Sequence, residues 1–419
     1  MYRRCLHRKR NCLKIVVLND LHPSQQGGAA SIALQNARFL ATENQVEYWC
    51  TGRSGKKVPI ESSLKIRIFR YGRFKKLFQE KFRVTKIYFE FIDLPITFRC
   101  LAEVLRFKPD LVWVHQIGNG FPKGITFAFR IFRIPTIQTF HDYSLLVPGK
   151  LFPSHFGWSN SEVDLLVSKL ESGELEPPRL RASNLLNSVA ITLRFVILRK
   201  LAKMNSRNIV VGPQQERIFL LFGLKKTTFL PNITSKCVCP DLKEVKVSDE
   251  LRILFAGRPA GKGLGSISRL VQNTPHAHLD LAGDADLLNY LPFDFPKSKF
   301  TFLGRLEHSE LLAAIHNYDY VSVLSECFDV YPTILIEALE HSSRVLCTST
   351  VGNHSAITSD KFGYQLAYDL DFNEISLTQL INEEKFHPFG PSTTDMTMGE
   401  MKYQQELLRI ANAAVKLTR

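Results

Sequence analysis

The sequence predicts an α/β protein with two doubly wound, Rossmann-like parallel sheets that face a central cleft. Short β-branched runs alternate with longer segments of helical periodicity, and the runs are apolar throughout rather than at every second residue. Strands of that kind are buried on both faces, as they are in parallel sheets covered by helices. The length of 419 residues also exceeds what one ordinary hydrophobic core organises. We therefore expect two domains, each with its own sheet.

The predicted strands form two series, separated by the polar segment 235–250, which we expect to be a linker. The first series is predicted at 14–19, 46–52, 65–70, 110–115, 136–141, 208–212 and 227–232. The second is predicted at 252–257, 278–283, 300–304, 319–325 and 344–349. An amphipathic pattern ends the chain. We expect a first domain at 1–235, a second domain at 236–395 and a C-terminal helix at 396–419 that packs back on the first domain.

Composition restricts the class of protein. No run reaches the roughly 18 apolar residues that span a bilayer. The basic N-terminus is followed by only a short apolar run, which fits a first buried strand better than a signal peptide. The eight cysteines are scattered and lack metal-ligand spacing, so a reducing, cytoplasmic location is expected.

The positive charge is concentrated in the first half of the chain. Residues 1–240 carry +22, which leaves −8 of the total +14 for residues 241–419. Two basic stretches, 65–91 and 185–207, are interleaved with large apolar residues. They fit solvent-exposed helix faces on which lysine and arginine bury the aliphatic part of their side chains. They also fit a face that contacts an anionic membrane surface. Nucleic acid is a disfavoured partner, because no recognisable binding motif accompanies the charge.

A glycine-rich, doubly basic turn follows the first strand of the second series, in "ILFAGRPAGKGLGS" at 253–266. Counted from Gly257, a Walker A loop would need its second glycine where Lys262 stands, and the dinucleotide pattern GxGxxG cannot be completed. The remaining pattern is strand, Gly257, Arg258, three residues, Lys262, Gly263 and a helix. Two cations beside a helix N-terminus favour phosphate, although a basic loop without a ligand is also consistent.

A second constellation lies in "LSECFDVYPTILIEALE" at 324–340. Pro332 favours a helix start, and Asp329 and Glu337 are eight residues apart across it. Such a carboxylate pair can bind sugar hydroxyls, while the first amides of the helix, those of Thr333 and Ile334, can face a phosphate. A capping role is the alternative for Asp329, and a structural role is less favoured for Glu337 on its apolar helix.

The first half contributes two further strand-end features. "NDLHPSQQGGAASIA" at 19–33 contains Gly27 and Gly28, which allow backbone to approach a ligand closely or form a tight turn without one. His141 and Asp142 end the predicted strand 136–141. At the carboxyl end of a parallel strand their side chains are expected to project into the cleft.

In this order, the four elements resemble the motifs of the retaining nucleotide-sugar glycosyltransferases of the GT4 family, which have the two-domain GT-B fold. That family has a glycine loop after the first strand, a His or His-Asp in the first domain, G-R-x3-K at the start of the second, and E-x7-E. The resemblance covers roughly residues 14–360 and includes "HLDLAGD" at 278–284 and "FTFLGRL" at 300–306. Asp329 stands where the family usually has glutamate, and "EALEHSSRVLC" lacks the glycine that usually precedes the next strand.

The resemblance implies that the domain at 1–235 binds the acceptor and that the domain at 236–395 binds the nucleotide-sugar donor. It also implies a role for each matching residue. Arg258 and Lys262 are expected to hold the donor diphosphate and stabilise its charge as the glycosyl bond breaks. The amides of Thr333 and Ile334 would contribute to the same diphosphate site. Gly257 would lie against the nucleotide. No metal and no cofactor are implied, because these groups neutralise the diphosphate of a nucleotide-sugar co-substrate.

The implied catalytic residues are His141, Asp329 and Glu337. Asp329 would contact hydroxyls of the transferred sugar, Glu337 would bind the ribose, and His141 would lie near the reacting carbon. Gly27 and Gly28 would border the diphosphate or sugar from the opposite domain. Two neighbouring residues are further candidates: Asp142 and Tyr331.

We expect a glycan or lipid-linked acceptor, in the assembly of cell-surface polysaccharide or lipopolysaccharide, with the enzyme peripheral on the inner face of the cytoplasmic membrane. The long segment 148–178 is a candidate acceptor lid or an insertion. Three alternatives remain: a non-transferase enzyme such as a nucleotide-sugar epimerase, a basic nucleic-acid-binding protein, and a non-catalytic transferase-like partner.

Overall fold

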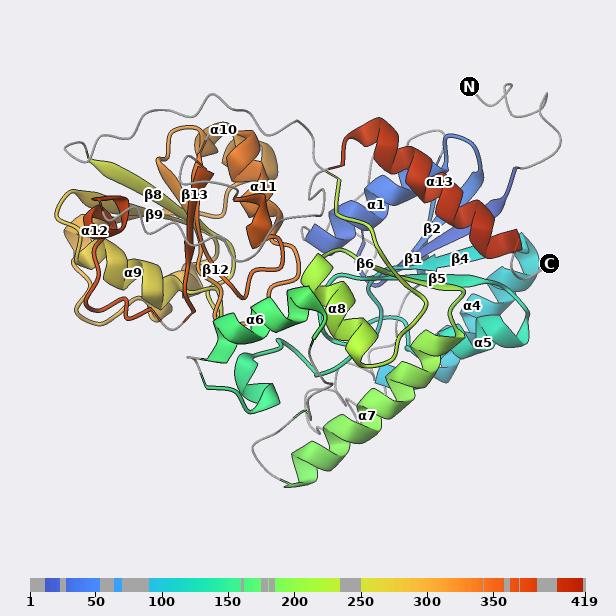
Figure 1. Ribbon diagram of the computed structural model, residues 1–419. Helices are drawn as coiled ribbons and strands as arrows, with labels where there is room; N and C mark the ends of the chain where they lie inside the picture. The colour runs from blue at the N-terminus through green and yellow to red at the C-terminus, as the bar shows by residue number, and fades with distance from the viewer. Residues whose placement is uncertain are drawn as a thin grey trace.

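Figure 1 shows two α/β lobes side by side in the computed structural model. The structure describes residues 12–22, 28–52, 64–69, 90–159, 162–174, 180, 185–233, 250–341, 343–357, 362–368, 370–382 and 398–416. The predicted domain boundaries at 235/236 and 395/396 lie outside these residues, and so does Gly27.

The first lobe contains a seven-stranded parallel sheet in the order β3-β2-β1-β4-β5-β6-β7. Its strands are β1 (Lys14–Asn19), β2 (Gln45–Thr51), β3 (Lys65–Phe69), β4 (Leu111–Val114), β5 (Thr136–Phe140), β6 (Arg207–Val210) and β7 (Thr227–Phe229). Its helices are α1 (Gly28–Leu40), α4 (Leu94–Phe107), α5 (Ile125–Ile131), α6 (Val163–Ser172), α7 (Leu185–Met204) and α8 (Pro213–Leu221). The central strands β1 and β4 are almost wholly buried, as their uninterrupted apolar runs require.

The second lobe contains a six-stranded parallel sheet in the order β10-β9-β8-β11-β12-β13. Its strands are β8 (Leu251–Ala256), β9 (Ala277–Ala282), β10 (Phe300–Gly304), β11 (Tyr320–Val323), β12 (Arg344–Thr348) and β13 (Gly363–Leu366). Its helices are α9 (Leu264–Gln272), α10 (His308–Ile315), α11 (Thr333–Glu340) and α12 (Leu377–Asn382). The sequence prediction missed β13, a four-residue strand that contains the polar Gln365 and so lacks an apolar run. The prediction of two doubly wound parallel sheets is otherwise confirmed.

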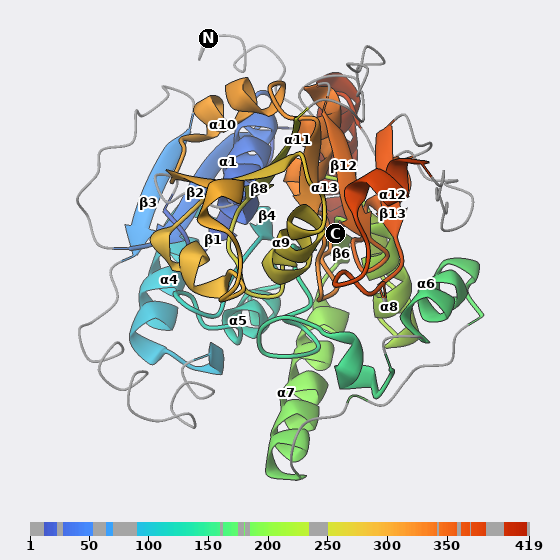
Figure 2. The same cartoon turned by 90° about the vertical axis from the view of Figure 1, so that its left-hand side faces the viewer.

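The C-terminal helix α13 (Glu400–Lys416) packs on the first lobe, as predicted. It lies beside α1 (Figures 1 and 2), and Figure 1 shows it far from α12, which precedes it in the chain. Its Tyr403 donates a hydrogen bond from Oη to Oδ1 of Asn36 at 3.0 Å, and its ring packs edge-on against Phe39. The chain therefore returns to the first lobe after building the second.

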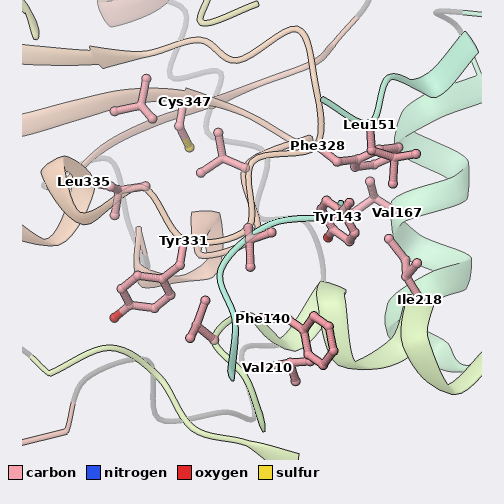
Figure 3. Packing of buried hydrophobic residues seen from close by; sticks show 14 of the residues in the cluster. Phe140, Tyr143, Leu151, Val167, Val210, Ile218, Phe328, Tyr331, Leu335 and Cys347 are labelled. Carbon is pink, nitrogen blue, oxygen red and sulfur yellow. The ribbon is translucent and has the colours of Figure 1, made fainter. Parts of the chain in front are cut away.

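Each sheet has a hydrophobic core, and a further core joins the two lobes. Figure 3 shows part of this shared core, where Phe140, Tyr143 and Ile218 of the first lobe lie close to Phe328 and Tyr331 of the second. In the described part of the chain, no helix has the length and apolar character needed to cross a membrane.

Candidate functional site

Both sheets have a point where the strand order reverses, between β1 and β4 in the first lobe and between β8 and β11 in the second. Ligands of doubly wound sheets bind at the carboxyl ends of the strands at such switch points. Three of the four predicted motif elements follow β1, β8 and β11, and His141 follows the adjacent β5. The topology therefore places the sequence motifs where this class of sheet binds ligands.

The carboxyl edges of the two sheets are in contact. The backbone N–H of Phe328, after β11, donates to the carbonyl of Leu151 at 2.8 Å, and the Phe328 ring lies 6.3 Å from that of Tyr143, after β5 (Figure 3). Nε2 of Gln214, at the start of α8, donates to the Ser349 carbonyl at 3.5 Å. The loop after β5, which begins with His141 and Asp142, thus meets the loop after β11, which carries Asp329.

Glycines shape the basic turn between β8 and α9. Gly257, Gly261 and Gly263 have φ angles of 135°, 64° and 73°. A Cβ on Gly263 would lie only 1.7 Å from the carbonyl oxygen of Leu324, so the turn needs glycine there both for its backbone angle and for space. The carbonyl of Gly261 accepts from the backbone N–H of Glu326 at 3.2 Å. These contacts fix the basic turn against the loop that carries Asp329.

Lys262 and Asp329 form an ion pair through Nζ and Oδ2, a contact that their separate predicted roles did not anticipate. The Asp329 side chain is 16% exposed and also accepts from Oγ of Ser325 at 3.2 Å, so it is held in one position. The sequence favoured either a helix cap or a ligand-binding role for Asp329, and no capping bond is present at α11. Lys262 is therefore a half-buried cation, held by a charged hydrogen bond in the turn after β8.

The other residues predicted to bind the diphosphate lie in the turn after β8 and at the start of α11. Arg258 is exposed, and Gly257 beside it is exposed as well. Thr333 and Ile334 open α11, where the first amides have no intrahelical acceptor and the helix dipole favours an anion. Tyr331 is 7% exposed and packs in the core between the lobes (Figure 3).

Glu337 lies on the second turn of α11 with 19% of its side chain exposed. Burial raises its pKa, against the opposing effects of nearby His308 and of a hydrogen bond with Thr333. His308 begins α10, and its Nε2 lies 3.9 Å from Oε1 of Glu337. Sequence reasoning missed His308, because no local pattern shows that α10 and α11 are neighbours.

His141 is paired with a second histidine at the first switch point. Its Nε2 lies 2.9 Å from Nδ1 of His115, and the two rings stack with centroids 5.3 Å apart. Burial lowers the pKa of His141 to about 4 and lowers that of His115 as well, so both rings are neutral and one donates to the other. The sequence prediction missed His115, although it also ends a predicted strand.

A cavity lies beside this histidine pair and is lined in part by Gln138 and Lys123. Lys123 and Arg194 both bind Oε1 of Glu90, each at 2.6 Å, and Nη1 of Arg194 also donates to the Ser144 carbonyl. Burial acts to raise the pKa of Glu90, but the Arg194 hydrogen bond and the Lys123 charge lower it overall. Glu90 therefore stays ionised and fixes Arg194 of α7, which in turn bonds to the loop after β5.

The other predicted residues of the first lobe are exposed. Gly28 begins α1 without a positive φ, and a Cβ there would meet nothing within 4 Å. Asp142 accepts from the backbone N–H of Ser144 at 2.8 Å and so shapes the turn after β5. Its carbonyl also accepts from Nε2 of Gln215.

Two longer predicted segments are described in part. Of the candidate lid 148–178, the structure describes 148–159 and 162–174, where α6 packs on α8 and residues 150–156 contact the second lobe. The basic stretch 65–91 is described only at its two ends. Within the described residues, no three His, Cys, Asp or Glu side chains group closely enough to hold a metal ion.

These two facing parallel-sheet domains, with the C-terminal helix returned to the first, form the GT-B fold of glycosyltransferases. Similar solved structures include sucrose-phosphate synthase from Thermosynechococcus elongatus, with a TM-score of 0.59, 15% identity and 97% of both chains covered. HepE from Anabaena in complex with UDP and glucose has a TM-score of 0.54 at 15% identity, again over 97% of both chains. An α,α-trehalose-phosphate synthase (UDP-forming) from Burkholderia xenovorans in complex with glucose-6-phosphate has a TM-score of 0.55 at 11% identity, over 97% of this chain and 98% of that one. No protein-family model and no curated protein matches the sequence.

Proposed function

We propose that the protein is a glycosyltransferase that moves a sugar from a nucleoside-diphosphate donor to an acceptor with retention of anomeric configuration. The observation that carries the proposal is the convergence of Lys262, Asp329, Glu337 and the first amides of α11 at one switch point. Proteins of the same fold support it, since HepE was solved with UDP-glucose and the trehalose-phosphate synthase with glucose-6-phosphate.

The second lobe supplies the groups that a departing diphosphate needs. Arg258 and Lys262 carry fixed positive charges, and the amides of Thr333 and Ile334 add the positive end of a helix dipole. Charge that develops on the leaving phosphate is stabilised by groups already in place. We propose that these groups make a metal unnecessary and that the nucleotide-sugar is the only co-substrate.

The sugar and ribose are assigned to the flanking residues. Asp329 would bind hydroxyls of the transferred sugar, Glu337 the ribose hydroxyls, and His141 the sugar near its anomeric carbon. The bond from that carbon to the diphosphate breaks, and an acceptor oxygen bonds to it on the same face. The acceptor proton passes to the departing phosphate oxygen.

A thermal-shift screen with UDP-, GDP- and dTDP-sugars tests the donor site. A donor that binds the folded protein raises its melting temperature, and the rise should shrink strongly in Arg258→Ala. Because the Arg258 side chain is exposed, the substitution should leave the unliganded melting temperature unchanged. An equal rise in both proteins would refute the placement of the diphosphate.

Incubation of the stabilising donor with candidate acceptors separates the alternatives. A transferase yields a new glycoside, whose anomeric configuration NMR reports, whereas an epimerase yields an isomerised nucleotide-sugar. A non-catalytic partner yields neither while still binding the donor. A nucleic-acid-binding protein would instead show steep, salt-dependent affinity for oligonucleotides, and it would leave Asp329 and Glu337 without a role.

We further propose a glycan or lipid-linked acceptor, as in cell-surface polysaccharide or lipopolysaccharide assembly, reached from the inner face of the cytoplasmic membrane. Figure 1 shows α4, α5 and α7 on the side of the first sheet opposite α1 and α13. These three helices expose large apolar side chains: Leu94, Phe98, Leu105, Phe127, Ile131, Val189, Leu193, Val196 and Ile197. They also expose cations: Arg99, Arg106, Arg130, Lys200 and Lys203. That mixture suits an anionic lipid surface.

Flotation with anionic liposomes at physiological salt tests this face. Wild-type protein should float with the vesicles, and Leu193→Asp on α7 should reduce the bound fraction. Met401→Asp is the matched control, because Met401 is an exposed apolar residue on α13, on the opposite side. Failure of the wild type to float would remove the membrane part of the proposal while leaving the donor site untouched.

A further inference from the structure

Lys150 of the first lobe reaches the basic turn of the second lobe. It lies in the loop between β5 and the short helix Pro153–Phe156, within the segment 148–178 predicted from the sequence as a candidate acceptor lid or an insertion. Its side-chain Cδ is 3.4 Å from the position that a Cβ on Gly261 would occupy. The lysine stem therefore packs directly on the turn that holds Arg258 and Lys262.

The loop that carries Lys150 is fixed on the second lobe. Its neighbour Leu151 is 1% exposed and accepts a backbone hydrogen bond from Phe328 at 2.8 Å. Phe156 packs edge-on against the Phe328 ring at 6.0 Å and stacks on Trp158 at 4.2 Å. Lys150 is thus positioned by contacts on both sides of the interface rather than by its own charge.

The ammonium group of Lys150 has no hydrogen-bond partner, although its Nζ is shielded from solvent. Asp329, one of the acids whose charge acts on Lys150, is already paired with Lys262. Burial lowers the pKa of Lys150, and the charge of Lys262 lowers it further. Three nearby groups raise that pKa, but by less in total: Cys327, Asp329 and Glu326. A shielded cation without a partner is costly, and a second cation beside it increases that cost.

We propose that Lys150 is a further cation for the donor diphosphate, contributed across the domain interface, so that both lobes hold the leaving group. This inference rests on the proposed glycosyltransferase function and extends its site to the first lobe. A diphosphate beside the 257–263 turn supplies the anionic partner that Lys150 lacks. The same diphosphate would contact Lys262, whose partner in the structure is Asp329. The lysine then stabilises the leaving group and links donor binding to contact between the lobes.

Titration calorimetry with UDP, GDP and dTDP tests the assignment on wild type, Lys150→Met, Lys150→Arg and Arg258→Ala. Loss of a charged hydrogen bond predicts that Lys150→Met weakens binding of the preferred nucleoside diphosphate by about 10- to 100-fold. The arginine variant should recover part of the loss. Lys169→Met, which removes an exposed cation from α6, is the matched control and should bind as the wild type does.

The melting temperature of the unliganded protein gives a second readout. Removing a shielded, unpartnered charge should leave it unchanged or raise it in Lys150→Met, whereas a lysine that served only structure would destabilise the fold when removed. Destabilisation with unchanged nucleotide affinity would overturn the inference.

The remaining outcomes separate this inference from the proposed function. If Arg258→Ala weakens binding and Lys150→Met does not, the inference fails and the donor site stands. An increased KM for a phosphorylated acceptor, with unchanged nucleotide affinity, would assign Lys150 to the acceptor instead and would also overturn it. If the wild type binds none of the three nucleotides, the proposed function fails and the inference fails with it.

Discussion

The carboxyl edge of the first sheet carries a pair of neutral, mutually bonded histidines, whereas the edge of the second sheet carries an ion pair. At the first edge, burial keeps His115 and His141 uncharged, and one ring donates to the other. At the second, Lys262 and Asp329 form an ion pair beside the start of α11. The difference suits a reaction in which the second domain supplies most of the groups that hold an anionic leaving group, while the histidines of the first face an uncharged sugar.

The largest effect is expected at the charged edge, from Glu337→Ala. We expect turnover to be abolished, because the proposed contact with the ribose hydroxyls is lost. The fold should stay intact, because alanine favours the helical backbone of α11 and the substitution removes an acid whose charged form is disfavoured by burial. Steady-state kinetics measures turnover, and the melting temperature measures the stability of the fold. Glu337→Gln is the control, since it keeps an acceptor oxygen and should retain more activity. Undiminished turnover in the alanine variant would remove Glu337 from the site.

The glycines at the two edges are not equivalent, and the sequence could not distinguish them. Gly263→Ala places a Cβ 1.7 Å from the Leu324 carbonyl in a left-handed backbone, so unfolding free energy should fall by about 2–4 kcal/mol. Gly28→Ala meets open space, and the change should stay below about 1 kcal/mol. Chemical denaturation compares the two. A similar loss in both variants would contradict the difference in packing.

Features that depend on local spacing could be predicted from the sequence. The apolar runs located the strands, because a strand buried on both faces needs them, and the short, polar-containing β13 was missed for the same reason. Gly263 before α9 and Pro332 before α11 marked the helix starts correctly, because each has a local backbone requirement.

Features that depend on neighbouring strands or domains could not be predicted. His115 and His141 meet only because β4 and β5 are adjacent, which no local pattern reveals. The pairing of Lys262 with Asp329 joins loops after β8 and β11, and Lys150 reaches the site only through contact between the lobes. For the histidine pair the sequence contained a weak signal, because two predicted strands each ended in histidine.

The most gradual effect is expected at the histidine pair of the first edge and appears in the pH dependence of stability. His141 has a folded-state pKa of about 4, below the unfolded value of about 6.5, so the unfolded chain binds protons first as the pH falls. The stability that the neutral ring contributes is therefore complete above about pH 6.5 and is lost as the pH falls through 4, by at most about 1.4 kcal/mol per pH unit.

Chemical denaturation between pH 7 and pH 4 should accordingly give a steeper decline in unfolding free energy for the wild type than for His141→Phe. Carboxylates that titrate in the same range contribute to both proteins, so the difference between the two curves isolates the histidine. His115→Phe should flatten the curve in the same direction, because burial lowers the pKa of His115 as well. Parallel curves would mean that His141 is protonated in the folded protein, and the first edge would then carry charge like the second.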